Sequence, residues 1–203
     1  MTSPEPSSGS RHSKRSSPAA SGKHHWRNIV FSMLLLPGAV LAQSDWSALQ
    51  DGTAVLFRHA NAPGIGDPGN FTLGDCATQR NLDATGRTQA SRIGEQFRRQ
   101  RIAVGQVLHS QWCRTRDTAQ LAFPGVASDA ATFNSFFKES ARSEEQTASA
   151  LQVLQRWKGP GVLVVITHQV NITALTGIFP ASGEGLIVKP APAGLTIVGR
   201  VQP

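Results

Sequence analysis

The chain has 203 residues and a mass of 21.7 kDa, which suffices for one compact domain and is too small for two ordinary ones. Its formal net charge of +7 is spread unevenly: residues 1–42 hold five basic residues and one acidic residue, and residues 43–203 hold fifteen and twelve. The near balance in the second part argues against a nucleic-acid-binding domain. Its composition is that of a globular domain, neither collagen-like nor disordered.

The first 42 residues predict an export signal. Residues 1–22 are rich in Ser and Pro and nearly free of apolar side chains, so we expect them to be disordered. Residues 23–42 combine a basic start, an apolar run over Ile29–Leu41 and small residues at the exit, which is the pattern of a secretory signal peptide cleaved after Ala42. The apolar run is shorter than the ~20 residues that span a bilayer, which makes an uncleaved anchor the weaker alternative. We therefore expect a periplasmic or secreted domain over residues 43–203, in contact with the membrane only through this segment.

That domain would contain two cysteines, Cys76 and Cys113. In an oxidising compartment such a pair is a candidate disulfide. The distance between the two side chains cannot be read from the sequence, so two free buried thiols remain the alternative.

Strands and helices alternate along the domain. Apolar runs rich in β-formers predict strands, and apolar positions at helical spacing predict the helices between them. The predicted strands cover 53–57, 106–109, 162–166, 186–188 and 195–198, and the predicted helices cover 85–101, the segment after Arg114 and the segment after Ser143. This alternation predicts a three-layer α/β/α sandwich with a mostly parallel central sheet, whose ligand crevice lies at the carboxyl ends of the strands.

Basic side chains follow three of the predicted strands. Arg58 and His59 end the first, Arg114 follows the second, and His168 follows the third. Guanidinium groups bind phosphate oxygens in pairs and stabilise the charge of a phosphoryl group in transfer, and a neutral imidazole can act as the nucleophile. A metal site is not indicated, because His59, His109 and His168 lack the short spacing of metal ligands.

Four ordered segments carry a resemblance to a known family. They are Val55–Ala60, Leu82–Ala90, Ser110–Ala119 and Val165–His168, and they lie within residues 53–200. Together they resemble the motifs of the histidine phosphatase superfamily, also called phosphoglycerate mutase-like, here as a small exported member. The resemblance implies the phosphoglycerate mutase-like fold, no cofactor, and a phosphohistidine intermediate on His59. It also implies a phosphate pocket completed by Arg58, Arg114 and His168, the last of which also counts as catalytic.

Hydrolysis also needs a proton donor for the leaving group, and several carboxylates of the sequence are candidates. Glu139 matches the position of the glutamate in the family's common branch, whereas the acid-phosphatase branch has an Asp where this chain has Gln169. We therefore expect Glu139 to be the catalytic acid. Its rivals are Asp75, Asp83, Glu144 and Glu145.

The sequence thus predicts an exported phosphatase that hydrolyses a small phosphomonoester. Two alternatives stay open: a phosphatase for phosphohistidine or another phosphoramidate, and a non-catalytic domain of the same fold that binds phosphorylated ligands. We expect residues 61–79 and 133–147 to form the walls of the pocket. Within the first of these walls and beside it, Gln79 and Arg80 are expected to serve as surface residues.

Overall fold

The structure of the protein is a computed structural model that describes residues 44–203. The predicted disordered segment 1–22 and the predicted signal peptide 23–42, with its cleavage point, lie outside the described residues. Within the described part, none of the helices combines the length and the apolar character of a bilayer span.

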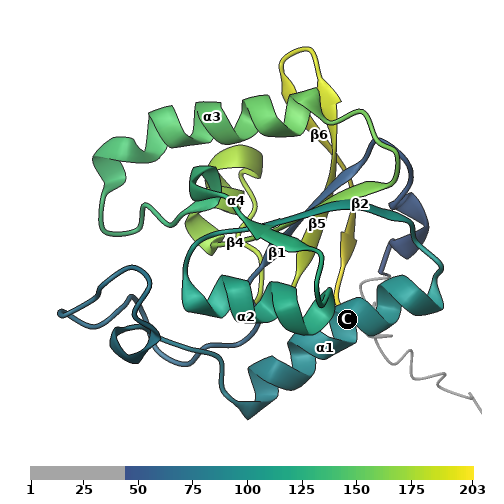
Figure 1. Cartoon of the computed structure of the whole chain (residues 1–203). Helices are drawn as coiled ribbons and strands as arrows, with labels where there is room; N and C mark the ends of the chain where they lie inside the picture. Colours follow the sequence, from purple (N-terminus) through teal and green to yellow (C-terminus); the bar gives the residue numbers. More distant parts are fainter. Residues whose placement is uncertain (1–43) are drawn as a thin grey trace, which may run out of the picture. The chain divides into compact units, whose positions relative to one another are not determined.

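Six strands form one mixed sheet in the order β3-β2-β4-β1-β5-β6 (Figure 1). The strands are β1 (Ala54–Arg58), β2 (Val104–His109), β3 (Ala127–Asp129), β4 (Val162–Thr167), β5 (Gly185–Ala191) and β6 (Gly194–Val201). Strands β1 to β4 pair in parallel, whereas β5 pairs antiparallel with both β1 and β6. The sheet is therefore mostly parallel where the strand ends of interest lie.

Four α-helices cover the two faces of the sheet. They are α1 (Ala84–Arg99), α2 (Cys113–Ala122), α3 (Ser143–Arg156) and α4 (Gln169–Thr176). Helices α1 and α2 lie on one face, and α3 and α4 lie on the other (Figure 1). The short 3-10 helices are η1 (Trp46–Ala48), η2 (Cys76–Thr78), η3 (Ala131–Phe133) and η4 (Ser140–Arg142). The predicted three-layer α/β/α sandwich is confirmed.

Alternation of side chains along the buried strands divides the core into two clusters. In β4, Val162, Val164 and Ile166 pack into the cluster under α1 and α2, whereas Leu163 and Val165 pack into the cluster under α3 and α4. All five are at most 1% exposed. A strand buried on both faces reads as a continuous apolar run because successive side chains point to opposite sides.

Two features of the sheet differ from the simplest expectation of alternating parallel strands. Strand β3 has only three residues with no fully buried side chain, so it carries no hydrophobic signal. Strands β5 and β6 follow one another without an intervening helix, which is why they form an antiparallel hairpin at the end of the sheet. Because β5 is antiparallel to β1, its start lies at the same edge as the predicted site residues, where the amide of Arg58 donates to the Glu184 carbonyl at 3.0 Å.

The backbone beyond the strand ends continues the ladder and fixes the site residues. The amide of His59 donates to the Thr167 carbonyl at 2.9 Å, and the amide of Ser110 donates to the Ile166 carbonyl at 3.0 Å. His168 is the N-cap residue that directly precedes α4. The ends of β1, β2 and β4 are thereby held side by side.

Candidate active site

A cavity of about 370 Å³ is lined by residues that follow β1, β2 and β4. Arg58, His59, Arg114 and His168 all line it, so the structure brings together the four residues that the strand ends predicted. A second cavity of about 440 Å³ lies where β2 and β4 begin, and no histidine lines it. The chemistry points to the first cavity, which we call the basic cavity.

The imidazole of His59 is held with one nitrogen unprotonated. Its Nδ1 lies 2.8 Å from the Ala60 carbonyl, which only accepts, so Nδ1 carries the proton and donates. Its Nε2 accepts from Nε of Arg114 at 3.2 Å and therefore carries a lone pair. The side chain is 2% exposed. His59 is thus a neutral tautomer with a nucleophilic nitrogen, oriented by the carbonyl of the following residue, Ala60.

His168 is the second buried imidazole. Its Nδ1 lies 3.4 Å from Nη2 of Arg114, which only donates, so the proton lies on Nε2, 2.7 Å from Oγ of Ser110. The rings of His59 and His168 are 5.6 Å apart, centroid to centroid. Trp112 packs edge-on against His168 at 5.3 Å. The ring is therefore fixed on both sides.

Burial and neighbouring cations lower the pKa of both histidines. For His59, burial lowers the pKa well below the ordinary value of 6.5, and the positive charge of Arg114 lowers it further. The same two causes, in the same order, lower the pKa of His168. Both imidazoles are consequently neutral at pH 7, the state a nucleophile requires.

Arg114 is paired with a carboxylate that the sequence reading missed. Asp67 accepts from Nη1 of Arg114 at 2.7 Å and from Nη2 at 3.3 Å, and also from the indole N–H of Trp112 at 3.0 Å. Burial favours the neutral form of Asp67, but these hydrogen bonds and the Arg114 charge outweigh it and lower the pKa below its ordinary value. The signal available in the sequence was that Asp67 is the one acidic residue in the Gly- and Pro-rich loop between His59 and Asp75.

Two further arginines line the basic cavity. Arg58 donates through Nη1 to the Pro180 carbonyl at 3.0 Å, and its buried Nε has no partner within the described part of the chain. Arg80 donates through Nε to the Gly66 carbonyl at 2.9 Å and through Nη1 to the Ala62 carbonyl. The expected surface role of Arg80 is therefore wrong, since the loop folds back and turns this side chain inward.

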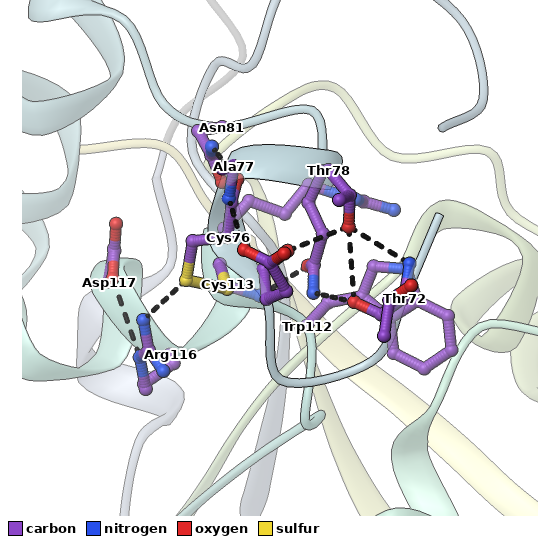
Figure 2. The surroundings of a disulfide bond; sticks show 12 residues. Thr72, Cys76, Ala77, Thr78, Asn81, Trp112, Cys113, Arg116 and Asp117 are labelled. Carbon is purple, nitrogen blue, oxygen red and sulfur yellow. Dashed lines mark hydrogen bonds and ion pairs between the residues drawn. A yellow bond between two sulfur atoms is a disulfide. The ribbon is translucent and has the colours of Figure 1, made fainter. Parts of the chain in front are cut away.

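The loop over residues 61–83 is fastened next to the site by a disulfide. Cys76 and Cys113 are bonded, with their Cα atoms 5.7 Å apart (Figure 2). Cys113 opens α2 directly before Arg114. The side chain of Gln79 is buried, contrary to the surface role expected for it, and its Oε1 accepts from the amide of Cys113 at 2.9 Å. The loop that carries Asp67 and Arg80 is thus tied covalently to the helix that carries Arg114.

No protein-family model matches the sequence, and no curated protein sequence does. Solved structures do match. Rv3214 from Mycobacterium tuberculosis has a TM-score of 0.57 at 16% identity, with 75% of this chain and 99% of that chain covered. The phosphoglycerate mutase from Thermus thermophilus has a TM-score of 0.51 at 16% identity, with 74% and 99% covered. The chain has the phosphoglycerate mutase-like fold. A mutant phosphoserine phosphatase from Entamoeba histolytica, in complex with phosphoserine, is similar at a TM-score of 0.51 and 12% identity, with 73% and 95% covered.

In this phosphoglycerate mutase-like domain, the predicted acid Glu139 lies at the rim of the basic cavity. Its side chain is 61% exposed and pairs with Arg142 at 3.0 Å. The rivals do not line the cavity. Asp75 accepts from the amide of Ala77, Asp83 accepts from the amide of Gly86 at the start of α1, and Glu144 and Glu145 are exposed in the first turn of α3. Asp67 therefore lies deeper in the cavity than the carboxylate that the sequence favoured.

The basic cavity of the phosphoglycerate mutase-like domain gathers three arginines and two histidines, and no metal-binding cluster accompanies them in the described part of the chain. Within residues 44–203, no three His, Cys, Asp or Glu side chains are gathered as a metal ion would need. His109 does not line the basic cavity; its Nδ1 bonds the Ser110 carbonyl at 2.8 Å. The cations at the base of the cavity suit a phosphoryl group, which bears charge on three oxygens.

Proposed function

We propose that the domain is an exported phosphatase that hydrolyses a phosphomonoester through a phosphohistidine on His59. The observation that carries this proposal is the geometry of His59, a neutral, buried imidazole whose unprotonated Nε2 faces Arg114 in the basic cavity. A similar structure is that of a phosphoserine phosphatase variant in complex with phosphoserine, which supports a phosphomonoester as the class of substrate.

Arg114, Arg58 and Arg80 bind the phosphoryl group in this proposal. Each lines the basic cavity, and burial lowers the pKa of each from an ordinary value so high that all three stay charged. The unpartnered Nε of Arg58 gains an acceptor when a phosphate oxygen arrives. Such donors lower the barrier because they are already oriented where negative charge develops.

The first chemical step forms the phosphohistidine. Nε2 of His59 attacks phosphorus, the bond from phosphorus to the alcohol oxygen breaks, and the N–H of Arg114 that bonded Nε2 turns to a phosphoryl oxygen. The negative charge of a bound phosphate dianion favours the protonated form of His168 and so raises its pKa. We therefore expect this ring to take up a proton on Nδ1, and this N–H to donate a hydrogen bond to the phosphoryl group.

Asp67 is the proton donor in this account, in place of the sequence-based candidate Glu139. A phosphate dianion competes with the Asp67 carboxylate for Arg114, and its negative charge favours the protonated form of the displaced carboxyl group. The protonated Asp67 then gives its proton to the departing alcohol oxygen. In the second step the Asp67 carboxylate takes a proton from water as the water oxygen attacks phosphorus, the bond from phosphorus to Nε2 breaks, and inorganic phosphate is released.

Export is supported by the leader and by the disulfide. Residues 23–42 have the pattern of a cleaved signal peptide, and a bond between Cys76 and Cys113 persists in an oxidising compartment. N-terminal sequencing of the protein recovered from a periplasmic or culture fraction tests this: a start at Gln43 is expected, and full-length protein in the cytoplasm contradicts export.

Turnover of p-nitrophenyl phosphate and of a panel of phosphomonoesters tests the activity. Hydrolysis by residues 43–203 that is lost in His59→Ala and kept in His109→Gln supports the proposal. The second variant changes a buried histidine outside the basic cavity. Hydrolysis restricted to phosphoramidates points to the phosphohistidine alternative, and phosphate binding without any turnover points to a binding domain.

A further inference from the structure

Large apolar side chains are exposed at the mouth of the basic cavity. Ile65, Phe137 and Phe179 all line it, and 93%, 55% and 66% of these residues' surfaces are exposed. They come from three separate segments: the loop after β1, the segment after η3 and the turn after α4. Three distant parts of the chain thus place apolar groups around one opening.

This apolar mouth, formed by Ile65, Phe137 and Phe179, adjoins the arginines and histidines of the basic cavity. Phe71 stacks on Trp112 with ring centroids 5.1 Å apart and an interplanar angle of 19°. The indole ring of Trp112 also packs against His168 and donates to the carboxylate of Asp67. On a second side, the Arg58 guanidinium lies 5.8 Å from the ring centroid of Phe179. If the phosphate of a bound molecule lies among the arginines, the rest of that molecule therefore contacts the aromatic rings beside them.

The polar side chains at the same mouth are engaged within the protein. Lys138 donates to the carbonyls of Asp67 and Pro68, at 2.9 and 3.3 Å. Gln169 donates to Oγ1 of Thr173, and Glu139 accepts from Arg142. A sugar or another polyhydroxyl alcohol would compete there with these contacts within the protein, whereas an apolar group displaces water from the exposed side chains of Ile65, Phe137 and Phe179.

We propose that the substrate's alcohol carries an apolar aryl or alkyl group, which packs on Ile65, Phe137 and Phe179 while the phosphate binds the arginines. The inference rests on the proposed function for the role of the phosphate site. It adds the substrate class, a hydrophobic phosphomonoester. Contiguous exposed apolar surface beside a charged cleft is typical of a ligand site.

Binding of alkylphosphonates tests the apolar mouth without requiring turnover, because their carbon–phosphorus bond is not hydrolysed. Calorimetric titration of residues 43–203 with ethyl-, butyl- and hexylphosphonate is expected to show affinity rising with chain length, by up to about fourfold per methylene. Equal affinity along the series overturns the proposal. Loss of turnover alongside a retained chain-length dependence would count against the phosphatase and leave the apolar subsite in place.

Variants locate the effect. Ile65→Ser and Phe137→Ser are expected to weaken hexylphosphonate binding and to leave ethylphosphonate binding unchanged, whereas Phe137→Leu restores most of the loss. Val126→Ser is the matched control, since Val126 is 62% exposed and does not line the basic cavity. Equal losses for both phosphonates in Ile65→Ser and Phe137→Ser overturn the assignment of the mouth.

The apolar group of the proposed substrate could belong to a soluble alcohol or to a lipid. Sedimentation with phosphatidylcholine vesicles, with and without phosphatidic acid, distinguishes them. Binding that requires phosphatidic acid and falls in Phe137→Ser assigns a lipid, and the absence of sedimentation together with chain-length-dependent phosphonate binding assigns a soluble aryl or alkyl phosphate.

Discussion

Asp67 and Arg114 form a two-pronged ion pair inside the basic cavity, with Oδ1 2.7 Å from Nη1 and Oδ2 3.3 Å from Nη2. Their side chains are 10% and 4% exposed. A phosphate that binds as proposed takes the same pair of donors, so in this proposal the carboxylate keeps the guanidinium oriented until the anion binds. In the proposed mechanism this pair places an acid beside the phosphoryl group, and no other carboxylate of the described chain pairs with Arg114.

Asp67→Asn separates the proton donor from a merely structural partner. Alkyl phosphates have a poorly stabilised leaving group, so their kcat is expected to fall by about 10²- to 10⁴-fold, the usual contribution of general acid catalysis. p-Nitrophenyl phosphate releases a stable phenolate that needs no proton donor, so the kcat for this substrate is expected to fall far less. The measurement is kcat for both substrates with the variant and the unmodified domain.

Glu139→Gln is the control for that experiment, because Glu139 is the acid that the sequence favours. It is expected to leave both rates nearly unchanged. A selective loss on alkyl phosphates in Glu139→Gln, with none in Asp67→Asn, would return the role to Glu139. If Asp67→Asn instead raised both the phosphate affinity and kcat, Asp67 would only compete with phosphate for Arg114 and would not be the proton donor.

Arg80→Ala tests whether the loop contributes a phosphate ligand. Removal of this cation is expected to raise KM and the inhibition constant of inorganic phosphate by about tenfold, which corresponds to ~1.4 kcal/mol. Arg87→Ala is the matched control, since Arg87 is exposed on α1 and lies 3.9 Å from Asp117. Equal constants in the two variants would show that Arg80 serves only to hold its own loop.

The buried histidines predict a specific dependence of stability on pH. His59 and His168 have folded-state pKa values well below 6.5, so the unfolded chain binds protons that the folded chain does not. Stability is therefore full above pH 6.5 and declines as the pH falls below it, by up to ~1.4 kcal/mol per pH unit for each group. The lowered pKa of Asp67 removes further stability only below about its ordinary value of 3.8.

Thermal unfolding across pH checks this. The variant His168→Asn is expected to show a shallower decline of Tm between pH 6.5 and 4.5 than the unmodified domain. A Tm that is flat in this interval, or one that rises as the pH falls, would mean that the imidazoles are charged in the folded state.

The disulfide predicts a joint loss of stability and affinity on its removal. Cys76 and Cys113 are 37 residues apart, for which loop-closure entropy gives a stabilisation of about 4 kcal/mol. The double variant Cys76→Ser and Cys113→Ser is expected to lower Tm and to raise KM, because the loop with Asp67 and Arg80 loses its tether. Chemical unfolding and steady-state kinetics measure both, and a changed Tm with an unaltered KM would confine the bond to a structural role.

The residues at the base of the site were predictable because they lie at or directly after the ends of predicted strands. Arg58 is the last residue of β1, His59 follows it, and His168 follows β4. Periodicity and the rule that ligands bind at the carboxyl ends of parallel strands therefore suffice to bring them together. Arg114 needs only one more inference, that α2 begins close to the end of β2.

The walls of the site were not predictable in the same way. Asp67 and Arg80 reach the cavity through a loop whose path depends on a disulfide, on Gln79 and on backbone carbonyls that accept from Arg80. Such contacts have no period in the sequence. Glu139 shows the converse, since a position that fits a family pattern lies at the rim and pairs with its neighbour Arg142.

Trapping the covalent intermediate shows whether His59 is the nucleophile. The domain is mixed with a hydrolysable phosphomonoester, quenched in alkali, which preserves phosphohistidine, and digested for peptide mass spectrometry. A phosphoryl group is expected on the imidazole of His59, in the peptide that contains this residue, and is expected to be absent from the His59→Ala variant. Turnover with no phosphorylated peptide, or with the phosphoryl group on His168 instead, would exclude His59 as the nucleophile.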